Sequence, residues 1–263
     1  MFRLTREVRF AVNLSTRPEE QFGHKPTNSF AGYPSLNGLG LFLAIRVTLR
    51  GDLDPSSQYL MNIKEVDDFV RDDLPQAIRM IQHGTRSPAR LLGLFESVLC
   101  DAWRERLDSV ALVLSPFLVL SSHSSERPML RLSQRFEFSA SHRLHNPALS
   151  DDENRRCFGK CNNPHGHGHN YEVQVTLRGE PDANGLLVSV PAFERVVAET
   201  VIDRFDHKHL NTEIPEFHDL IPSVENIARV IYRLLKPKFE AERATLASVT
   251  VWETPKTWCE YSE

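Results

Sequence analysis

The sequence has few cysteines, no long apolar run and no excess of positive charge, and each absence excludes a class of protein. Four cysteines in 263 residues are too few and too scattered for a disulfide framework, which favours a reducing compartment. No apolar run approaches the ~20 residues of a membrane span, and residues 1–15 lack a signal-peptide pattern. A formal net charge of -4 argues against a nucleic-acid partner. We therefore expect a cytoplasmic globular protein of one or two domains that binds neither membrane nor nucleic acid.

An internal repeat is the strongest feature of the chain's organisation. Residues 38–54 (GLGLFLAIRVTLRGDLD) align with residues 166–182 (GHGHNYEVQVTLRGEPD) at a constant offset of 128, with 8 identities in 17 positions. Further on, SVALVLSP (109–116) aligns with SVTVWETP (248–255) at an offset of 139, so the second copy has 11 extra residues in between. The sequence therefore predicts a duplicated unit.

The second copy contains the pattern of a small α+β unit. Alternating apolar residues predict strands over 135–144, 171–178 and 247–253, with a further strand in the tail. Helical spacing follows Pro191 at a first helical position and Ser223 as an N-cap. The first copy repeats the helical periods. We predict two tandem units of order ββααββ, each an antiparallel four-stranded sheet with two helices on one face.

The domain boundary is expected at the polar segment SSHSSERP, which ends in proline and separates the two copies. We assign residues 1–120 to a degenerate unit, 121–130 to a linker, and 131–263 to a unit that carries chemistry.

Three histidines of the second copy are predicted to share one face of the sheet. His167 and His169 are two residues apart, and His142 continues the apolar alternation of a neighbouring strand. Three neutral imidazoles leave one position open on a tetrahedral ion, as in catalytic zinc sites. The alternative is a pair of half-exposed polar residues at a turn. The repeat favours a metal, because the first copy keeps both glycines and the strand but has Leu39 and Leu41 at the histidine positions.

Six segments in this order closely resemble the 6-pyruvoyl-tetrahydropterin synthase and 6-carboxytetrahydropterin synthase family of tunnelling-fold enzymes. They are FSASHRL, SDDEN, FGKCNNPHGHGHNYEV, FDHKHLN, PSVEN and VWET, and the resemblance covers about residues 131–263. It implies a tunnelling fold for each unit, with the first copy lacking the functional residues.

The resemblance also implies a set of site residues. His142, His167 and His169 would bind Zn²⁺, and Cys161 would accept a carbon-bound proton. A cysteine needs a lowered pKa for this role, which nearby zinc and a histidine could provide. We expect Cys157 to be a small packing residue.

Two further motifs receive roles by the same resemblance. Asp206 and His207 would relay protons, and Glu253 would anchor the pterin. Glu253 interrupts an apolar strand, where a carboxylate needs a partner, and the first copy has Leu114 there. Glu225 is a weaker candidate for substrate contact, because a helix first turn already favours a carboxylate. His209 and His218 are expected to be exposed.

The implied substrate is 7,8-dihydroneopterin triphosphate, and two products stay open. One reaction yields 6-pyruvoyl-tetrahydropterin; the other yields 6-carboxy-5,6,7,8-tetrahydropterin on the route to deazaguanines such as queuosine. The alternative function is a zinc-bound structural or pterin-binding module without turnover. Because four-stranded sheets leave exposed edges, we expect a homo-oligomer, a trimer or a dimer of two-unit chains.

Overall fold

The computed structural model describes residues 1–17, 20–23, 25–240 and 243–263. The chain divides into two compact units. One comprises Met1–Leu132 with Gly179–Leu187, and the other comprises Ser133–Arg178 with Val188–Glu263.

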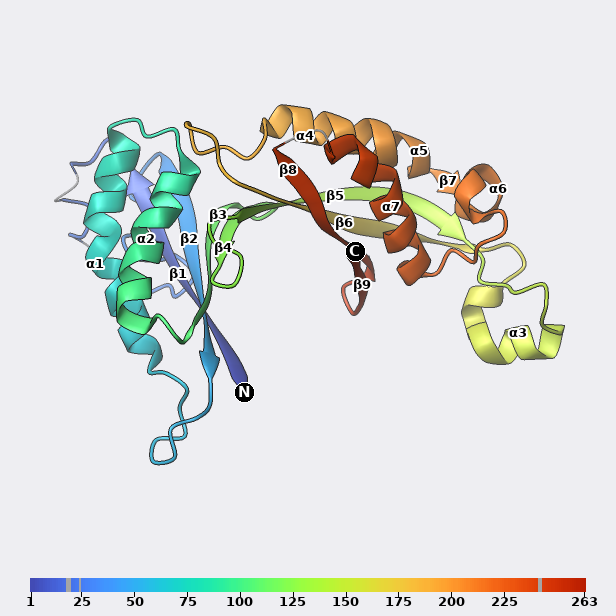
Figure 1. Ribbon diagram of the computed structural model, residues 1–263, viewed down its shortest axis with the longest axis horizontal. Helices are drawn as coiled ribbons and strands as arrows, with labels where there is room; N and C mark the ends of the chain where they lie inside the picture. Colours follow the sequence, from blue (N-terminus) through green and yellow to red (C-terminus); the bar gives the residue numbers. More distant parts are fainter. Residues whose placement is uncertain (18–19, 24, 241–242) are drawn as a thin grey trace. The chain divides into compact units, whose positions relative to one another are not determined.

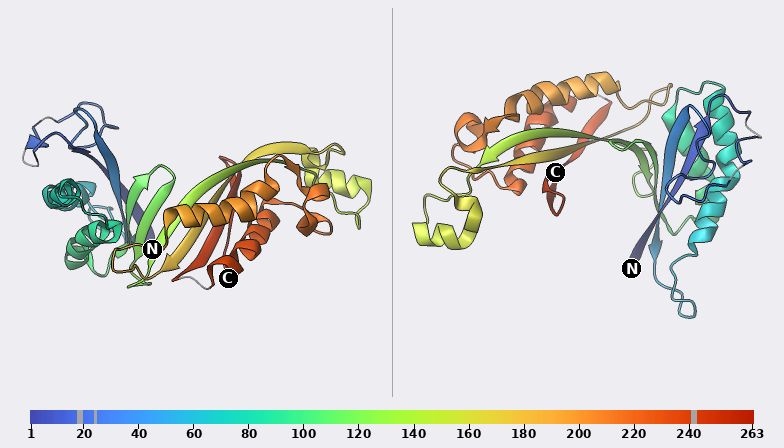
Figure 2. Two further views of the ribbon diagram at one scale, coloured as in Figure 1. Left: turned by 90° about the horizontal axis from the view of Figure 1, so that it is seen from above. Right: turned by 180° about the vertical axis from the view of Figure 1, so that it is seen from behind.

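The first unit is an antiparallel sheet with two helices packed on one face (Figure 1, Figure 2). Its strands follow the order β1-β2-β3-β4. Even-numbered apolar residues of the first strand face the helices. One example is Phe10, whose ring centroid lies 6.5 Å from that of Phe95 on the second helix. Asn62 and Ser87 cap the two helices through their side chains. The elements are β1 (Phe2–Asn13), β2 (Gly40–Gly51), α1 (Ile63–Gln82), α2 (Pro88–Trp103), β3 (Leu107–Ser115) and β4 (Leu118–His123).

The second unit repeats this order with additional short elements. Its strands are β5 (Leu130–His142), β6 (His167–Gly179), β8 (Ala244–Thr254) and β9 (Thr257–Tyr261), hydrogen-bonded in the order β5-β6-β8-β9. The two-residue strand β7 (Lys208–His209) pairs in parallel with β5 at Ala140 and Ser141.

Two long helical segments cover one face of this second sheet (Figure 2). The first continues from an α-helix through a π-helical turn, and the second is capped by Ser223. Shorter helices lie in the connections before β6 and after β7. The helical elements are α3 (Asp151–Phe158), η2 (Gly159–Asn162), α4 (Val190–Val197), η3 (Ala198–Ile202), α5 (Asp203–Phe205), α6 (Leu210–Glu213), η4 (Pro215–Phe217) and α7 (Val224–Phe239).

The predicted fold class is confirmed, since both units contain four strands and two main helices in the order ββααββ. The element bounds needed correction. β5 begins at Leu130 because buried Leu130 and Leu132 already alternate with half-buried neighbours, and it ends at His142. That the first unit is a degenerate copy of the second stays a prediction.

The predicted linker is shorter than 121–130, because Ser121–His123 belong to β4 and pair with β3. Their polarity is misleading: Ser122 is buried, and its hydroxyl donates to Glu96 Oε1 at 2.6 Å. Residues 124–128 form the turn before β5. In the described ranges of the chain, no helix is long and apolar enough to cross a membrane.

Aromatic packing anchors the helices of the second unit to its sheet. Phe193 of α4 is fully buried and makes edge contacts with Phe136 of β5 at 5.9 Å and Phe239 of α7 at 5.8 Å. We expect Phe193→Ala to lower the free energy of unfolding by about 3–5 kcal/mol, from lost burial and a residual cavity. Phe117→Ala, at a ring that is 61% exposed, should change it by less than ~1 kcal/mol. Denaturant unfolding checks both, and equal effects would contradict this packing.

Candidate functional site

His142, His167 and His169 lie together where β5 ends and β6 begins. Their ring centroids are 4.5, 5.2 and 4.8 Å apart, and one ligand nitrogen from each lies within 4.8 Å of the others. The strands cause this convergence. Alternation aims His167 and His169 to the same side as buried Tyr171, and β5 runs alongside with His142 on that side. Gly166 permits this, because a Cβ there would lie 2.9 Å from the His142 carbonyl oxygen.

The surroundings of His142 hold its ring in one tautomer. Its Nδ1 lies 2.7 Å from the Pro222 carbonyl oxygen, which can only accept, so Nδ1 carries the proton. Its Nε2 is then a free acceptor, 3.1 Å from Nε2 of His167. Burial lowers the pKa of His142 to about 4 and also lowers the pKa of His167. Both imidazoles are therefore neutral at pH 7, with lone pairs available.

The nitrogen atoms of this cluster fit a divalent metal ion. Within the described part of the chain, His169 Nε2 is buried without a hydrogen-bond partner, as a nitrogen that awaits a metal would be. Two nitrogens on one tetrahedral zinc ion, each ~2.0–2.1 Å from it, lie about 3.4 Å apart. The 3.1 Å between His142 and His167 is close to this spacing. A hydrogen bond from the non-ligating nitrogen of His142 to a carbonyl is the usual outer contact of such a ligand.

The carboxylate of Glu253 lies against the same histidines. Its Oε1 is 3.3 Å from His142 Nε2 and 3.6 Å from His169 Nε2, and the side chain is 18% exposed. β8 brings it here because it is the strand next to β6. Neither nitrogen donates a hydrogen bond to it, because His142 Nε2 is an acceptor in this tautomer and His169 Nε2 has no hydrogen-bond partner among the residues that the structure describes. The partner that the sequence led us to expect would therefore be a bound cation or a ligand. This position leaves two chemical roles available, acceptance of N–H groups from a ligand and coordination of the metal.

Cys161 lies in η2 and is tied to the chain segment that follows His142. Its carbonyl oxygen accepts the Leu144 N–H at 2.9 Å. The adjacent Asn162 side chain lies 3.2 Å from Arg143 Nη2 and 3.1 Å from His145 Nδ1. Burial, and then the charge of Glu253, raise the pKa of the Cys161 thiol. Among the groups that act on this thiol here, none lowers its pKa, and a cation bound by the histidines would supply the lowering that its predicted role requires.

The reactivity of Cys161 should show this dependence. In metal-free protein we expect iodoacetamide to alkylate Cys161 more slowly at pH 7.5 than free cysteine, with a rate that rises above pH 9 as the thiolate forms. Loading the histidines with zinc should move the profile to lower pH. Mass spectrometry of the peptide can follow exposed Cys157 as the internal reference. If zinc leaves the pH dependence of alkylation unchanged, the bound metal does not affect the pKa of Cys161.

The structure corrects two expectations for single residues. Cys157 is exposed on α3 rather than packed, because α3 buries only Asn154. His209 is half-buried rather than exposed. Its Nε2 would lie 3.1 Å from a Cβ at Gly166, and its Nδ1 has no hydrogen-bond partner in the described ranges.

Asp206 and His207 form a hydrogen-bonded pair beside β5. Asp206 Oδ1 accepts the Ser139 N–H at 2.8 Å, and its Oδ2 lies 2.7 Å from His207 Nδ1. These hydrogen bonds, first that from Ser139, lower the pKa of Asp206. His207 is 83% exposed and has a φ of 57°, a left-handed conformation that non-glycine residues rarely adopt. Strained backbone of this kind concentrates at functional sites.

His207 and His169 both line an open pocket of about 540 Å³. Ser139, Ser141, Lys208, His209 and Glu213 complete its polar wall. His207 of the Asp206–His207 pair and His169 of the histidine cluster therefore share one pocket. Cys161 is connected to the cluster differently, through the hydrogen bond between its carbonyl oxygen and Leu144, which follows His142.

Glu225 occupies the first turn of α7, as predicted, and is exposed. Its charge contributes to raising the pKa of Cys259 on β9, after the larger effect of burial.

Sequence reasoning missed the residues that support the site. Asn211 fixes the backbone of Arg143 from both sides, accepting its N–H at 2.8 Å and donating to its carbonyl at 3.0 Å. Tyr171 is fully buried under the histidines, with ring centroids 6.1 Å from His142 and 5.5 Å from His169. The contact of the Pro222 carbonyl with His142 could not be predicted from residue types, because every residue has a backbone carbonyl.

Fold and site define an α+β protein whose second unit has a histidine cluster that could hold a metal, beside a thiol and an Asp–His pair. Residues 131–263 match the family model described as 6-pyruvoyl tetrahydropterin synthase. The chain belongs to this family, and its homologues make it an enzyme of the pterin synthase type.

Curated relatives carry two related names. The chain is 42% identical to 6-pyruvoyl tetrahydrobiopterin synthase of Homo sapiens over 129 residues, which are 49% of this chain and 88% of the human protein. It is 27% identical to 6-carboxy-5,6,7,8-tetrahydropterin synthase of Haemophilus influenzae over 156 residues, covering 51% of this chain and 100% of that protein. Among solved structures, that of Caenorhabditis elegans 6-pyruvoyl tetrahydropterin synthase is similar, with a TM-score of 0.49, 36% identity, and coverage of 52% and 96% of the two chains.

Proposed function

We propose that the protein is a zinc-dependent lyase that acts on 7,8-dihydroneopterin triphosphate and releases triphosphate. The observation that supports this most strongly is the cluster of three histidines, with their ligand nitrogens within 4.8 Å, next to the segment that holds Cys161. Zinc bound there would acidify the carbinol positions of the substrate side chain.

The chain's own residues then have separable tasks. Cys161 takes the carbon-bound proton, and His207, held by Asp206, passes protons to and from the side-chain oxygen atoms. Glu253 accepts N–H groups from the edge of the pterin, for which a carboxylate is a suitable partner. Its position 3.3 Å from His142 supports this role, because the pterin ring and its side chain would then be held close to the same group of residues.

The proposed product is 6-pyruvoyl-tetrahydropterin. Relatives named for the pyruvoyl reaction are 42% and 38% identical in human and Drosophila melanogaster, against 27% for the carboxy enzyme of Haemophilus influenzae. Five residues separate Cys161 from His167, a gap that resembles the pyruvoyl form but also occurs in bacterial members assigned to the carboxy reaction. The carboxy product, formed with loss of acetaldehyde, is the second candidate.

Incubating the full chain, loaded with zinc, with 7,8-dihydroneopterin triphosphate tests the proposal. We expect release of triphosphate and a pyruvoyl pterin, detected by mass spectrometry. Acetaldehyde with a carboxy pterin would assign the other lyase reaction. Binding of the pterin without release of triphosphate would instead identify a non-catalytic pterin-binding module, and metal analysis of the purified protein would test the choice of zinc.

Assembly into a homo-oligomer is part of the proposal. β1 is an edge strand in the first unit's strand order and β9 in the second's, and unpaired edges favour association. We expect a trimer or a dimer of chains in light scattering at micromolar concentration. A stable monomer under those conditions would contradict this expectation.

A further inference from the structure

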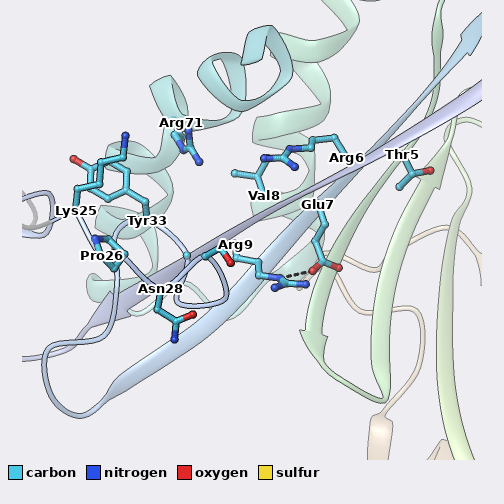
Figure 3. Close-up of a pocket in the computed structure, with 12 residues that line it drawn as sticks. Thr5, Arg6, Glu7, Val8, Arg9, Lys25, Pro26, Asn28, Tyr33 and Arg71 are labelled. Atoms are coloured by element: carbon cyan, nitrogen blue, oxygen red, sulfur yellow. Dashed lines mark hydrogen bonds and ion pairs between the residues drawn. The ribbon is translucent and has the colours of Figure 1, made fainter. Parts of the chain in front are cut away.

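The first unit contains a second polar pocket, of about 360 Å³, for which the sequence suggested no ligand (Figure 3). The edge strand β1 forms one wall, residues 25–33 form another, and Arg71 reaches in from α1. Four cationic side chains line it, Arg6, Arg9, Lys25 and Arg71, with Glu7 as the acidic one. A cationic pocket is unexpected in a chain of net charge -4.

Asp67 neutralises part of this charge from α1. Arg6 binds it with two hydrogen bonds, of 2.7 and 2.8 Å, and Arg71 Nη2 lies 3.5 Å from the same carboxylate. Two guanidinium groups thus share one carboxylate. The Nε of Arg71 is buried and has no hydrogen-bond partner within the described ranges. Arg71 therefore retains positive charge that the shared carboxylate does not balance.

At Glu7, too, two guanidinium groups share one carboxylate. Arg9 binds one oxygen of its carboxylate at 2.6 Å, and Arg46 binds the other at 2.7 Å. Lys25 is exposed and has no ion-pair partner among the residues that the structure describes. Around the pocket, five cationic groups thus face the two carboxylates of Glu7 and Asp67. The excess is positive, which suits an anion of more than one charge.

Close backbone packing and hydrogen bonds hold the wall formed by residues 25–33 against β1. Gly32 has a φ of 75°, and a Cβ there would lie 2.7 Å from the Arg9 carbonyl, so only glycine allows this approach. Tyr33 N–H donates to the Arg9 carbonyl at 2.9 Å, and its hydroxyl donates to the Phe22 carbonyl at 3.1 Å. The Arg71 guanidinium lies 6.0 Å from the Tyr33 ring centroid. A pre-organised wall reduces the entropy that binding costs.

We propose that this pocket binds a small molecule carrying a chain of phosphate groups. The planar guanidinium of Arg71 matches the oxygens of a phosphate, and Lys25 adds a point charge on the wall formed by residues 25–33. The volume of about 360 Å³ is within the range of small-molecule sites. Two sources share this chemistry, an inorganic polyphosphate and the phosphate chain of a nucleotide. The proposal does not depend on the reaction of the second unit.

Isothermal titration of the full chain with inorganic tripolyphosphate, and separately with ATP, tests the site. We expect saturable binding that weakens as salt is raised. Arg71→Ala and Lys25→Ala should each weaken it about tenfold, because each removes a charged hydrogen-bond donor. Arg71→Lys keeps the positive charge but loses the paired donors of the guanidinium, so its affinity should lie between those of wild type and Arg71→Ala. The matched control is Arg79→Ala, an exposed arginine in the last turn of the same helix, which should bind as wild type.

Tighter binding of ATP would assign a nucleotide, and equal binding of tripolyphosphate would assign the phosphate chain itself. Three results would overturn the proposal: no binding of either probe, binding that the double variant Lys25→Ala/Arg71→Ala leaves unchanged, or equally tight binding of citrate. The double variant also distinguishes this pocket from any triphosphate site in the second unit. Circular dichroism checks that each variant is folded, and exposed Lys25 provides a substitution that disturbs no packing.

Discussion

Replacing His169 with alanine should remove the bound metal and abolish turnover. His169 contributes a buried Nε2 that has no other hydrogen-bond partner in the described part of the chain. Loss of an outer contact to a metal ligand already costs ~10–100-fold in affinity, so loss of the ligand itself should cost at least about 100-fold. His169 is a better choice than His142, because His142 is fully buried and its removal would also leave a cavity.

Elemental analysis and competition with a zinc chelator measure this effect. His218→Ala is the matched control, since His218 is exposed and should leave metal content and turnover at the wild-type level. Both variants should unfold at a similar denaturant concentration once the metal is removed. Retention of one tightly bound ion per chain by His169→Ala would show that the metal does not lie between these histidines.

Replacing Cys161 with alanine should abolish triphosphate release and leave the metal in place. General base catalysis contributes about 10²–10⁴-fold, so the rate should fall by that factor. The thiol is not among the residues that converge as metal ligands, so metal affinity should stay within a few-fold of wild type. This pattern separates Cys161 from His169, whose replacement is expected to remove both properties.

Cys157→Ala is the control for Cys161. It removes an exposed thiol of α3, four positions earlier in the chain, and should leave the rate unchanged. Joint loss of metal and activity in Cys161→Ala would make Cys161 a ligand rather than a base. A rate that stays at the wild-type level would exclude it from the reaction.

The sequence predicted the fold and the convergence of the histidines because both follow from periodicity. Side chains two residues apart share a face of a strand, so His167 and His169 had to point the same way as Tyr171. The position of His142 followed from the alternation in β5 and from the pairing of neighbouring strands. The repeat supplied the remaining evidence, since leucines stand at the same positions in the first unit.

Contacts made by the backbone and by irregular segments could not be predicted in this way. Pro222 holds His142 through a carbonyl, and Cys161 is tied to Leu144 through its own carbonyl, so no side-chain pattern marks either bond. His209 follows the Asp206–His207 pair in a two-residue strand, too short to produce an alternation. Polar residues were also misleading in β4, where Ser122 is a buried strand residue bonded to Glu96.

The left-handed backbone of His207 has a consequence for the evolution of this chain. For an L-amino acid this conformation costs about 1–2 kcal/mol, whereas glycine adopts it freely. Selection for folding stability alone would therefore favour glycine at position 207. If the imidazole acts in the reaction, as proposed, thermostabilised descendants of this protein should keep histidine at position 207 wherever they keep the activity.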